Sequence, residues 1–319
     1  MATIIAECCQ NHKGDTAILK DMVWSAAEAD ADYIKIQTVH PDDLTFRERF
    51  ENGVVEKGLR KVIKRPYQLE YDRLKGLELN KDVYAWFVEE CKNAGIKPLT
   101  TVFTIGWVKE LAGLGWEDIK IASYDCASYP LLLAVKKHFN HLFVSTGATF
   151  NHEIEKAVKV INGKSFSFLH CVTIYPTPLS ELHLSRMEFL RHFTKSVGFS
   201  DHTLTKRDGI KASAVAIHLG ADVVERHFTI LNPDETKDGP VSVNPDQLKT
   251  ICLLAHGSAG EREEWCKENV GDFDCMLGEQ KRNLSQDELM SRDYYRGRFA
   301  THLPGGKVLY NWQNEDEVK

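Results

Sequence analysis

The sequence lacks the signatures of several common protein classes. Its eight cysteines contain no CxxC pair, which argues against a zinc ribbon and a thioredoxin-like redox motif. No apolar stretch approaches the roughly 18 residues that a membrane span requires, and no basic segment followed by an apolar one opens the chain. No GxGxxG follows the first apolar run, so a dinucleotide-binding turn is not indicated. These absences predict a cytoplasmic protein with reduced, mostly buried thiols.

An excess of positive charge is missing as well. The chain carries 46 acidic and 40 basic residues, which gives a formal net charge of −6. Neither nucleic acid nor a membrane is therefore expected as the main partner. A small anionic substrate remains compatible with this charge, because a local group of lysines can oppose the global sign. The length of 319 residues, 43% of them hydrophobic, fits one large α/β domain or two small domains.

One local pattern recurs along the chain: a short, β-branched apolar run that ends in a polar residue, followed by an amphipathic segment. Near-continuous hydrophobicity is typical of strands that are buried on both faces. The eight runs are residues 3–7, 33–37, 97–101, 118–122, 142–145, 166–171, 196–200 and 222–227.

Recognisable helix ends separate these runs. Asn80 and Asn151 precede segments 81–94 and 152–161, where each can cap the first turn of a helix. Eight strand–helix units predict a (β/α)₈ TIM barrel rather than a doubly wound open sheet, which would show fewer strands and a glycine-rich first turn. We expect the barrel domain to occupy residues 1–280 and a short C-terminal extension to occupy residues 281–319.

One long insertion, residues 39–79, interrupts the repeat after the second run. It is charged and contains several arginines and lysines. In a barrel this insertion lies on the catalytic face, where lids occur. A solvated surface excursion is the alternative, and the sequence does not separate the two.

The polar residues at the strand ends predict the active site, because barrels catalyse at the C-terminal ends of their strands. Lys35 and Lys120 each lie between two isoleucines, where an ammonium group is costly unless it meets an anion. The pair fits an anionic phosphate–carboxylate ligand better than a Schiff base.

His202 and His227 end the last two runs, close enough to share a divalent metal. Ser145 opens a Ser-Thr-Gly turn that can hold phosphate oxygens.

Several motifs, in order over roughly residues 3–280, resemble the N-acetylneuraminate (sialic acid) synthases and their legionaminate and pseudaminate relatives. Tyr-Pro-Thr-Pro at 175–178 and Ser-Asp-His-Thr at 200–203 together make the resemblance specific. The other motifs are Ile-Ile-Ala-Glu at 4–7, Asn-His at 11–12, Lys-Ile-Gln-Thr at 35–38, Lys-Ile-Ala-Ser at 120–123, Ser-Thr-Gly at 145–147, His-Cys at 170–171 and Glu-Arg-His-Phe-Thr at 225–229.

The resemblance implies a carbohydrate-biosynthetic transferase that condenses phosphoenolpyruvate with an N-acetylmannosamine-like aldose, giving a nonulosonate-type 3-deoxy-2-keto sugar acid. It implies a divalent metal held by His202 and His227, with Mn²⁺ as the first candidate and Mg²⁺ or Co²⁺ as alternatives. Glu7, Lys120 and Glu225 would be catalytic. The implied substrate-binding residues are Lys35, Gln37, Thr101, Ser123, Asp125, Ser145, Thr173, Tyr175, Ser200 and Asp238.

The sequence departs from the family pattern at several points. Asp125 replaces the usual Glu, Thr173 replaces the usual Asn, and Asp238 stands near the place of a usual Gly-Pro-Asp. We expect the C-terminal antifreeze-like domain to be absent, because residues 291–308 resemble at most its beginning. In typical members that domain reaches the partner subunit's site, so a homodimer here would need another surface. Cys9 is either a ligand of a softer metal, as in related barrels that make 3-deoxy-octulosonate phosphate, or a plain buried thiol.

Three other functions stay open from the sequence. The same condensation could take a phosphorylated or non-acylated sugar, which an arginine pair reaching the site from residues 39–79 would support. A metal-dependent keto-acid aldolase or lyase would need no phosphoenolpyruvate. A non-catalytic barrel that serves as a binding subunit is the last option, and the intact lysines and histidines argue against it.

Overall fold

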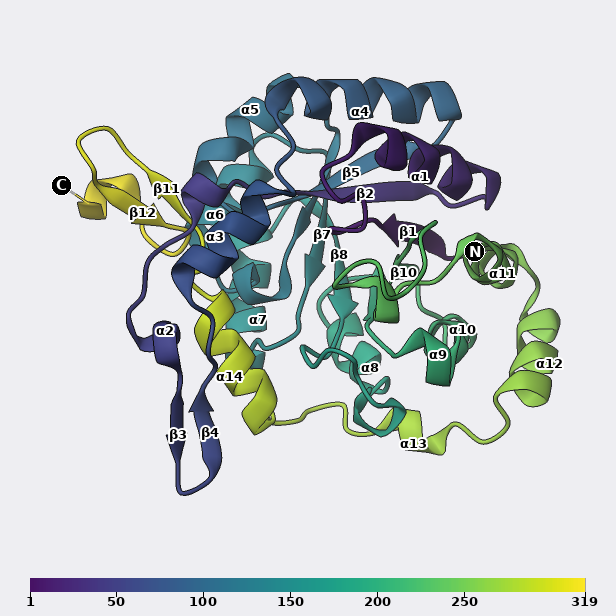
Figure 1. Ribbon diagram of the computed structural model, residues 1–319. Coiled ribbons are helices and arrows are strands. Elements are labelled where there is room, and N and C mark those ends of the chain that lie inside the picture. The colour runs from purple at the N-terminus through teal and green to yellow at the C-terminus, as the bar shows by residue number, and fades with distance from the viewer. Residues whose placement is uncertain (319) are drawn as a thin grey trace.

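A closed barrel of eight parallel strands forms the centre of the computed structural model, which describes residues 1–318. The prediction of a TIM barrel is therefore confirmed, and each observed strand overlaps its predicted run. Helices surround the barrel on the outside (Figure 1). In barrel order after β1 the strands run β10, β9, β8, β7, β6, β5 and β2. Their bounds are β1 (Thr3–Glu7), β2 (Tyr33–Thr38), β5 (Lys97–Val102), β6 (Asp118–Ile121), β7 (His141–Ser145), β8 (Ser165–His170), β9 (Val197–Asp201) and β10 (Val223–His227).

Local capping defines several helix ends. The Asn80 side chain accepts a hydrogen bond of 3.0 Å from Val83 N, as expected, and Gly95 ends the same helix in the left-handed conformation. Asn151 is not a cap: it is the first residue of its helix, and Phe150 precedes it. The outer helices are α1 (Thr16–Glu28), α4 (Lys81–Ala94), α5 (Val108–Gly113), α6 (Tyr129–Lys136), α7 (Asn151–Ile161), α8 (Arg186–Arg191), α9 (Thr205–Asp208), α10 (Lys211–His218), α11 (Pro245–His256) and α12 (Ala259–Asn269).

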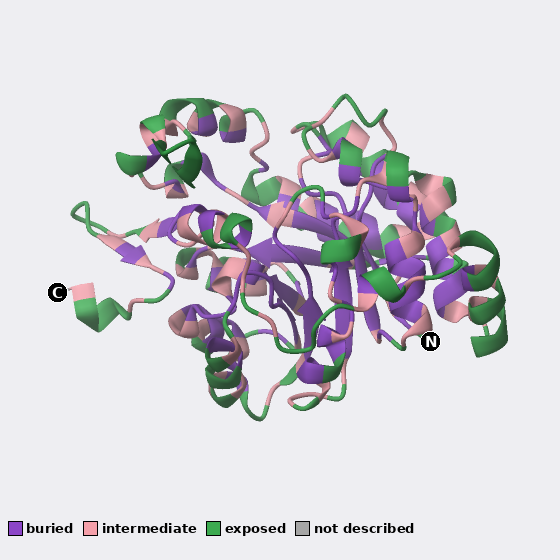
Figure 2. Ribbon diagram, turned by 90° about the horizontal axis from the view of Figure 1, so that it is seen from below, coloured by how far each residue is buried: buried purple, intermediate pink, exposed green. Residues whose placement is uncertain are grey.

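The side chains that point into the barrel form two layers. Because successive side chains of a strand alternate between its faces, every second residue of each run points inward. The lower layer is apolar and contains Ile5, Tyr33, Leu99, Phe143, Leu169 and Val223. The next inward position along most of these strands is polar. The outward-facing residues pack against the helices in the main hydrophobic core, so the buried residues concentrate in the central strands (Figure 2).

The insertion after β2 contains both a packed part and a projecting part. Its elements are α2 (Arg49–Asn52), the hairpin β3 (Val54–Glu56) and β4 (Leu59–Val62), and α3 (Tyr67–Lys75). The hairpin projects away from the barrel and is mostly exposed (Figure 1). In contrast, Leu74 of α3 packs with Leu44 and Phe299 in a small apolar cluster. The insertion thus has an exposed hairpin and a packed helix. The packed helix covers one side of the rim, which is the end of the barrel formed by the C-terminal ends of the strands.

The last part of the chain returns to the barrel. It contains α13 (Asp274–Leu277), α14 (Gln286–Tyr295) and a second hairpin, β11 (Ala300–His302) and β12 (Val308–Tyr310). The backbone amide of Thr45 donates to Arg298 O at 2.9 Å, which ties this segment to the insertion. Within residues 1–318, no helix combines the length and the hydrophobicity that crossing a bilayer requires.

Candidate active site

Glu225 lies at the centre of the polar layer. It points inward from β10, where Ser200 Oγ of β9 donates to its Oε1 at 2.9 Å. Its carboxylate is 3.8 Å from Lys120 Nζ and 3.7 Å from Lys35 Nζ. Burial alone would raise the pKa of Glu225, but the two lysines and Ser200 lower it to about 2. Glu225 is therefore an anion that joins both buried ammonium groups.

Lys35 is held between several groups of the barrel interior. Its Nζ donates to Thr101 Oγ1 at 2.9 Å and forms an ion pair with Glu7 at the end of β1. Burial lowers the pKa of Lys35 to about 7, with Lys120 adding to the shift and Glu225 opposing it. Glu7 in turn accepts a hydrogen bond from Cys9 N at 2.6 Å. An incoming anion would stabilise the charged form of this lysine.

Lys120 extends from β6 toward the end of β7. Its Nζ donates to Ser145 Oγ at 2.6 Å and to Ile121 O at 3.1 Å. Both side chains are almost fully buried. The Ser-Thr-Gly turn thus lies beside an ammonium group, which is the arrangement that a phosphate or carboxylate ligand requires.

Small side chains pack closely at the ends of β6, β7 and β8. Ser123 Oγ is 2.9 Å from Cys171 Sγ. A Cβ on Gly147 would lie 2.6 Å from that sulfur and 3.0 Å from Ser123 Oγ, so no larger residue fits here. Thr173 Oγ1 is buried and has no hydrogen-bond partner within residues 1–318. This hydroxyl can therefore replace at least part of the hydrogen bonding expected from the family's Asn.

The two predicted metal-binding histidines are neighbours. His202 and His227 have ring centroids 5.4 Å apart, and Tyr175 OH lies 3.2 Å from His202 Nε2. Burial lowers the pKa of His202 to about 4, and burial also lowers the pKa of His227 well below its usual value. Both imidazoles are consequently neutral near pH 7, the form that coordinates a metal.

A third and a fourth potential ligand lie beside His227. One ligand atom each of Cys9, His227 and Asp238 falls within 4.8 Å of the others. His227 Nδ1 and Asp238 Oδ2 are buried without a hydrogen-bond partner in the described chain, which is costly unless an ion binds there. Cys9 also has a φ of 44°, an unusual conformation for a residue other than glycine. A donor set of sulfur, nitrogen and oxygen fits a borderline divalent ion.

Two predicted substrate residues lie at the margin of this network. Gln37 is partly buried at the end of β2. Asp125 follows β6, where its Oδ1 accepts from Ser128 Oγ and from Asn311 Nδ2, both at 2.9 Å. Burial raises the pKa of Asp125 to about 6, although both hydrogen bonds oppose the shift. Asn311 belongs to the C-terminal hairpin region, and the sequence offered no signal for its approach to the rim.

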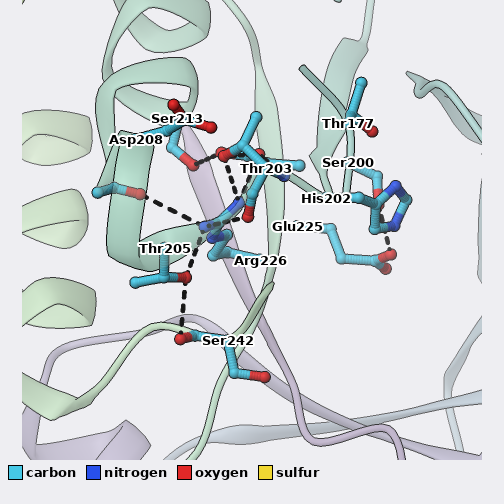
Figure 3. A network of polar contacts seen from close by, with 12 residues as sticks. Thr177, Ser200, His202, Thr203, Thr205, Asp208, Ser213, Glu225, Arg226 and Ser242 are labelled. Atoms are coloured by element: carbon cyan, nitrogen blue, oxygen red, sulfur yellow. Dashed lines mark hydrogen bonds and ion pairs between the residues drawn. The ribbon is translucent and has the colours of Figure 1, made fainter. Parts of the chain in front are cut away.

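A second polar network on the outer face of β9 and β10 supports the site (Figure 3). Arg226 points away from the barrel interior and pairs with Asp201 at 2.5 Å, and both side chains are fully buried. Arg226 also donates to Thr203 Oγ1 at 3.0 Å. Glu225 and His227 flank Arg226 on the strand, so this pair fixes the backbone that presents them.

The structure thus brings most of the predicted residues to one rim. Glu7, Lys35, Thr101, Lys120, Ser145, Ser200 and Glu225 form one connected set. Tyr175, His202, His227, Cys9 and Asp238 form a second set. His227 lies near enough to Glu225 and Lys35 for their charges to act on it, so the two sets adjoin. Together they can hold an anion and, beside it, a metal ion.

Comparison with known proteins gives consistent matches. The model of the NeuB family matches residues 22–258. An N,N'-diacetyllegionaminic acid synthase of Campylobacter jejuni is 33% identical over 78% of this chain and 74% of its own length. The enzyme of the same name from Legionella pneumophila is 30% identical over 92% and 78%. The crystal structure of an N-acetylneuraminic acid synthetase from Leptospira borgpetersenii, in complex with citrate, matches with a TM-score of 0.68 and 26% identity, covering 84% of this chain and 92% of that one.

Proposed function

The chain belongs to the NeuB family, and we propose that it condenses phosphoenolpyruvate with an aldose to give a 3-deoxy-2-keto sugar acid and phosphate. The observation that carries this proposal is the pair of buried lysines that share Glu225 beside two neutral imidazoles. The named relatives are sugar-acid synthases, and this site has the charges that their type of reaction needs. The acceptor that we propose is an unphosphorylated hexose similar to N-acetylmannosamine.

In the proposed reaction, Lys35 and Lys120 bind the carboxylate and phosphate groups of phosphoenolpyruvate, together with Thr101, Ser145 and Ser200. The vinyl carbon of phosphoenolpyruvate attacks the aldehyde carbon, and a water oriented by Glu225 or Glu7 adds to the enol carbon. The tetrahedral carbon then expels phosphate. The lysines stabilise the anionic groups throughout, mainly because they are already in place before the reaction begins.

His202 and His227 would hold the divalent metal, with Cys9 and Asp238 as further ligands. A bound metal supplies Lewis-acid polarisation of the aldehyde oxygen. The Tyr175 hydroxyl lies beside His202, where it can donate to the acceptor sugar.

A phosphorylated acceptor is the alternative, and the pairing of the arginines near the rim supports the unphosphorylated one. Arg73 does reach the rim from the insertion, where it donates to Gln10. However, Glu70 already accepts from Arg73 Nε at 2.9 Å and from Arg73 Nη2 at 2.7 Å, and it also pairs with Arg298. Glu70 therefore pairs with both guanidinium groups, which makes them less available to a phosphate and supports an acceptor without one.

The proposed function is tested by incubating the protein with phosphoenolpyruvate, Mn²⁺ and a panel of aldoses and their 6-phosphates. We expect phosphate release that depends on the aldose, and a product whose mass equals that of the aldose plus pyruvic acid. Removal of the metal with EDTA should abolish both. Formation of the same product from pyruvate would identify a keto-acid aldolase instead, and phosphate release without an aldose would indicate a phosphatase.

Cobalt binding tests the metal ligands independently of turnover. We expect the Co²⁺-loaded protein to show a near-ultraviolet charge-transfer band from a cobalt–thiolate bond, because Cys9 lies within the ligand cluster. Cys9→Ser should lose this band, whereas His202→Ala and His227→Ala should weaken metal binding by about 10-fold or more. Cys171→Ser is the matched control, since that buried thiol lies against Ser123 instead. An unchanged spectrum in Cys9→Ser would remove the thiolate from the ligand set.

A further inference from the structure

The loop after β1 carries Cys9 and bends sharply beside the candidate metal ligands. Cys9, Lys13 and Gly14 have φ values of 44°, 55° and 76°, which places three residues of one short loop in the left-handed region. This conformation is unfavourable for residues other than glycine, so the surrounding contacts must hold it. One of these contacts comes from the insertion, where Arg73 of α3 donates to Gln10 Oε1.

Asn11 joins the same loop to the loop after β10, residues 228–244. Its side chain is fully buried. Its Nδ2 donates to Phe228 O at 2.8 Å and to Ser242 Oγ at 2.9 Å, and its Oδ1 accepts from Thr236 Oγ1 at 2.6 Å. Because a backbone carbonyl can only accept, the Phe228 oxygen fixes which end of the Asn11 amide donates. One side chain thus makes three hydrogen bonds to a loop more than 200 positions away in the sequence.

The loop after β10 folds back onto the end of its own strand. Val243 N donates to His227 O at 2.8 Å, so the end of the loop returns to the point where β10 stops. Asp238 lies between these ends, next to Gly239. A Cβ on Gly239 would lie 2.3 Å from Pro233 O, so the turn that carries Asp238 is tightly packed.

Ser242 continues the hydrogen bonds of Asn11 as far as Asp238. Its Oγ accepts from Asn11 and donates to Asp238 O at 2.7 Å. Thr205 Oγ1 donates to Ser242 O at 3.0 Å, and Arg226 donates to Thr205 (Figure 3). The position of Ser242 is therefore set both by the loop after β1 and by the outer network around Arg226. A hydroxyl that accepts and donates at once also strengthens both of its bonds.

These contacts determine where two of the candidate metal ligands lie. Cys9 stands two residues before Asn11, and the backbone of Asp238 is bonded to Ser242. One ligand atom each of Cys9 and Asp238 lies within 4.8 Å of the other and of a His227 nitrogen. The pairing of β1 with β10 places His227 at the rim. Cys9 and Asp238 lie in loops beyond these strands, so their separation depends on the bonds between the two loops.

We propose that Asn11 is a positioning residue of the metal site, which brings Cys9 and Asp238 together beside His227 by joining the loops after β1 and β10. Asn11 acts through these ligands and not as a ligand itself, since its amide is already bonded within the two loops. The inference rests on the proposed function for the presence of the metal, and it adds the residue that assembles the ligand set.

Titration of Asn11→Ala with Co²⁺ tests this role without turnover. We expect the dissociation constant for Co²⁺ to rise about 10- to 100-fold, which is the usual effect of losing a residue that orients metal ligands. The cobalt–thiolate band at saturating Co²⁺ should also weaken, because Cys9 is no longer held in place. An unchanged dissociation constant with a full band would overturn the proposal.

The matched control is Asn311→Ala, which also removes a buried asparagine with two donated hydrogen bonds. Asn311 bonds to the loops after β5 and β6, and neither strand is a neighbour of β1 or β10. Its Co²⁺ affinity should therefore stay within about twofold of the wild type. A loss as large as that of Asn11→Ala would mean that any buried asparagine at the rim has this effect, and the specific role of Asn11 would be wrong.

Thermal denaturation with and without Co²⁺ separates positioning from a purely structural role. Asn11→Ala loses three hydrogen bonds, so its metal-free form should melt at a lower temperature under either role. A bound metal stabilises the folded protein by an amount that depends on its dissociation constant. We therefore expect Co²⁺ to raise the Tm of Asn11→Ala much less than that of the wild type. An equal rise in the two proteins would show that Asn11 only stabilises the fold.

Ser242→Ala is a milder second variant, which keeps the proposal testable if Asn11→Ala does not fold. It removes the bond to Asp238 O and should weaken Co²⁺ binding roughly fivefold, as the loss of one hydrogen bond predicts. In an Asp238→Ala background the same change should have an effect of at most about twofold, because the ligand that Ser242 positions is gone. Equal losses in both backgrounds would refute the connection from Asn11 to Asp238.

Cobalt binding also separates this inference from the proposed function. A wild type that binds Co²⁺ with a thiolate band but condenses no aldose refutes the proposed function, and the variants then still decide the role of Asn11. A wild type that binds no Co²⁺, or binds it without the band, refutes the inference, whatever the protein does with phosphoenolpyruvate.

Discussion

Replacing Lys120 with alanine is expected to lower kcat by roughly 10²- to 10³-fold, which is the loss seen when one preorganised donor to a developing charge is removed. Lys120 Nζ lies 2.6 Å from Ser145 Oγ and 3.8 Å from the Glu225 carboxylate, inside a water-excluded layer. Its charge cannot be replaced by solvent there, because the side chain is almost fully buried. Lys120 is also the cleaner choice of the two lysines. Loss of Lys35 would remove the ion-pair partner of Glu7 as well, whereas loss of Lys120 leaves Glu225 in contact with Lys35 and Ser200.

The measurement is phosphate release at saturating phosphoenolpyruvate, aldose and Mn²⁺. Lys97→Ala is the matched control: this lysine lies at the opposite, N-terminal end of a barrel strand, is exposed, and stacks on Tyr33 with 5.3 Å between Nζ and the ring centroid. Its kcat should stay within about twofold of the wild type. A Lys120→Ala protein that folds normally and loses less than fivefold would contradict the role assigned to this ammonium group.

Much of the barrel was predictable because its signal is local. A strand such as 33–38 must present apolar atoms to the helices and to the barrel interior, so it reads as a continuous apolar run. Lys35 stood out against that background for the same reason: an ammonium between two isoleucines has a cost that only a charged partner offsets. The sequence also predicted that the ends of β9 and β10 lie side by side, because consecutive strands are neighbours in a barrel. This placed His202 beside His227.

What the sequence did not predict depends on contacts between distant segments. Asp238 was expected to bind substrate, and its position beside Cys9 and His227 depends on how a loop after β10 folds back over β1. Residues 281–319 were expected to be a short C-terminal extension, yet Asn311 forms hydrogen bonds with loops about 190 to 210 positions earlier in the chain. Hydrophobic periodicity encodes which face of an element is buried, but not which distant loop will cover it.

Replacing Arg226 with alanine is expected to lower the free energy of unfolding by about 3–5 kcal/mol. Both Arg226 and Asp201 are fully buried, and the guanidinium donates to Asp201, to Thr203 Oγ1 and to Thr205 Oγ1. Asp201 also accepts from Ser213 Oγ of α10 at 2.6 Å. Removing the arginine leaves the aspartate as an uncompensated charge between the barrel and its outer helices, and the remaining hydroxyl donors only partly offset it.

Urea denaturation of Arg226→Ala measures this loss, with Lys267→Ala as the control for removing a charge from an ion pair. Lys267 pairs with Glu263 on the exposed face of α12, where solvent screens the pair, so that change should leave the free energy of unfolding nearly unchanged. Arg226→Lys should still be strongly destabilised, because one ammonium cannot reach both hydroxyls and the carboxylate as a guanidinium does. Since Arg226 lies between Glu225 and His227 on β10, we also expect weaker metal binding in any variant that folds. A loss of stability below about 1 kcal/mol would show that water or a rearranged side chain reaches Asp201, and that the outer network does not fix the strand that presents the active-site residues.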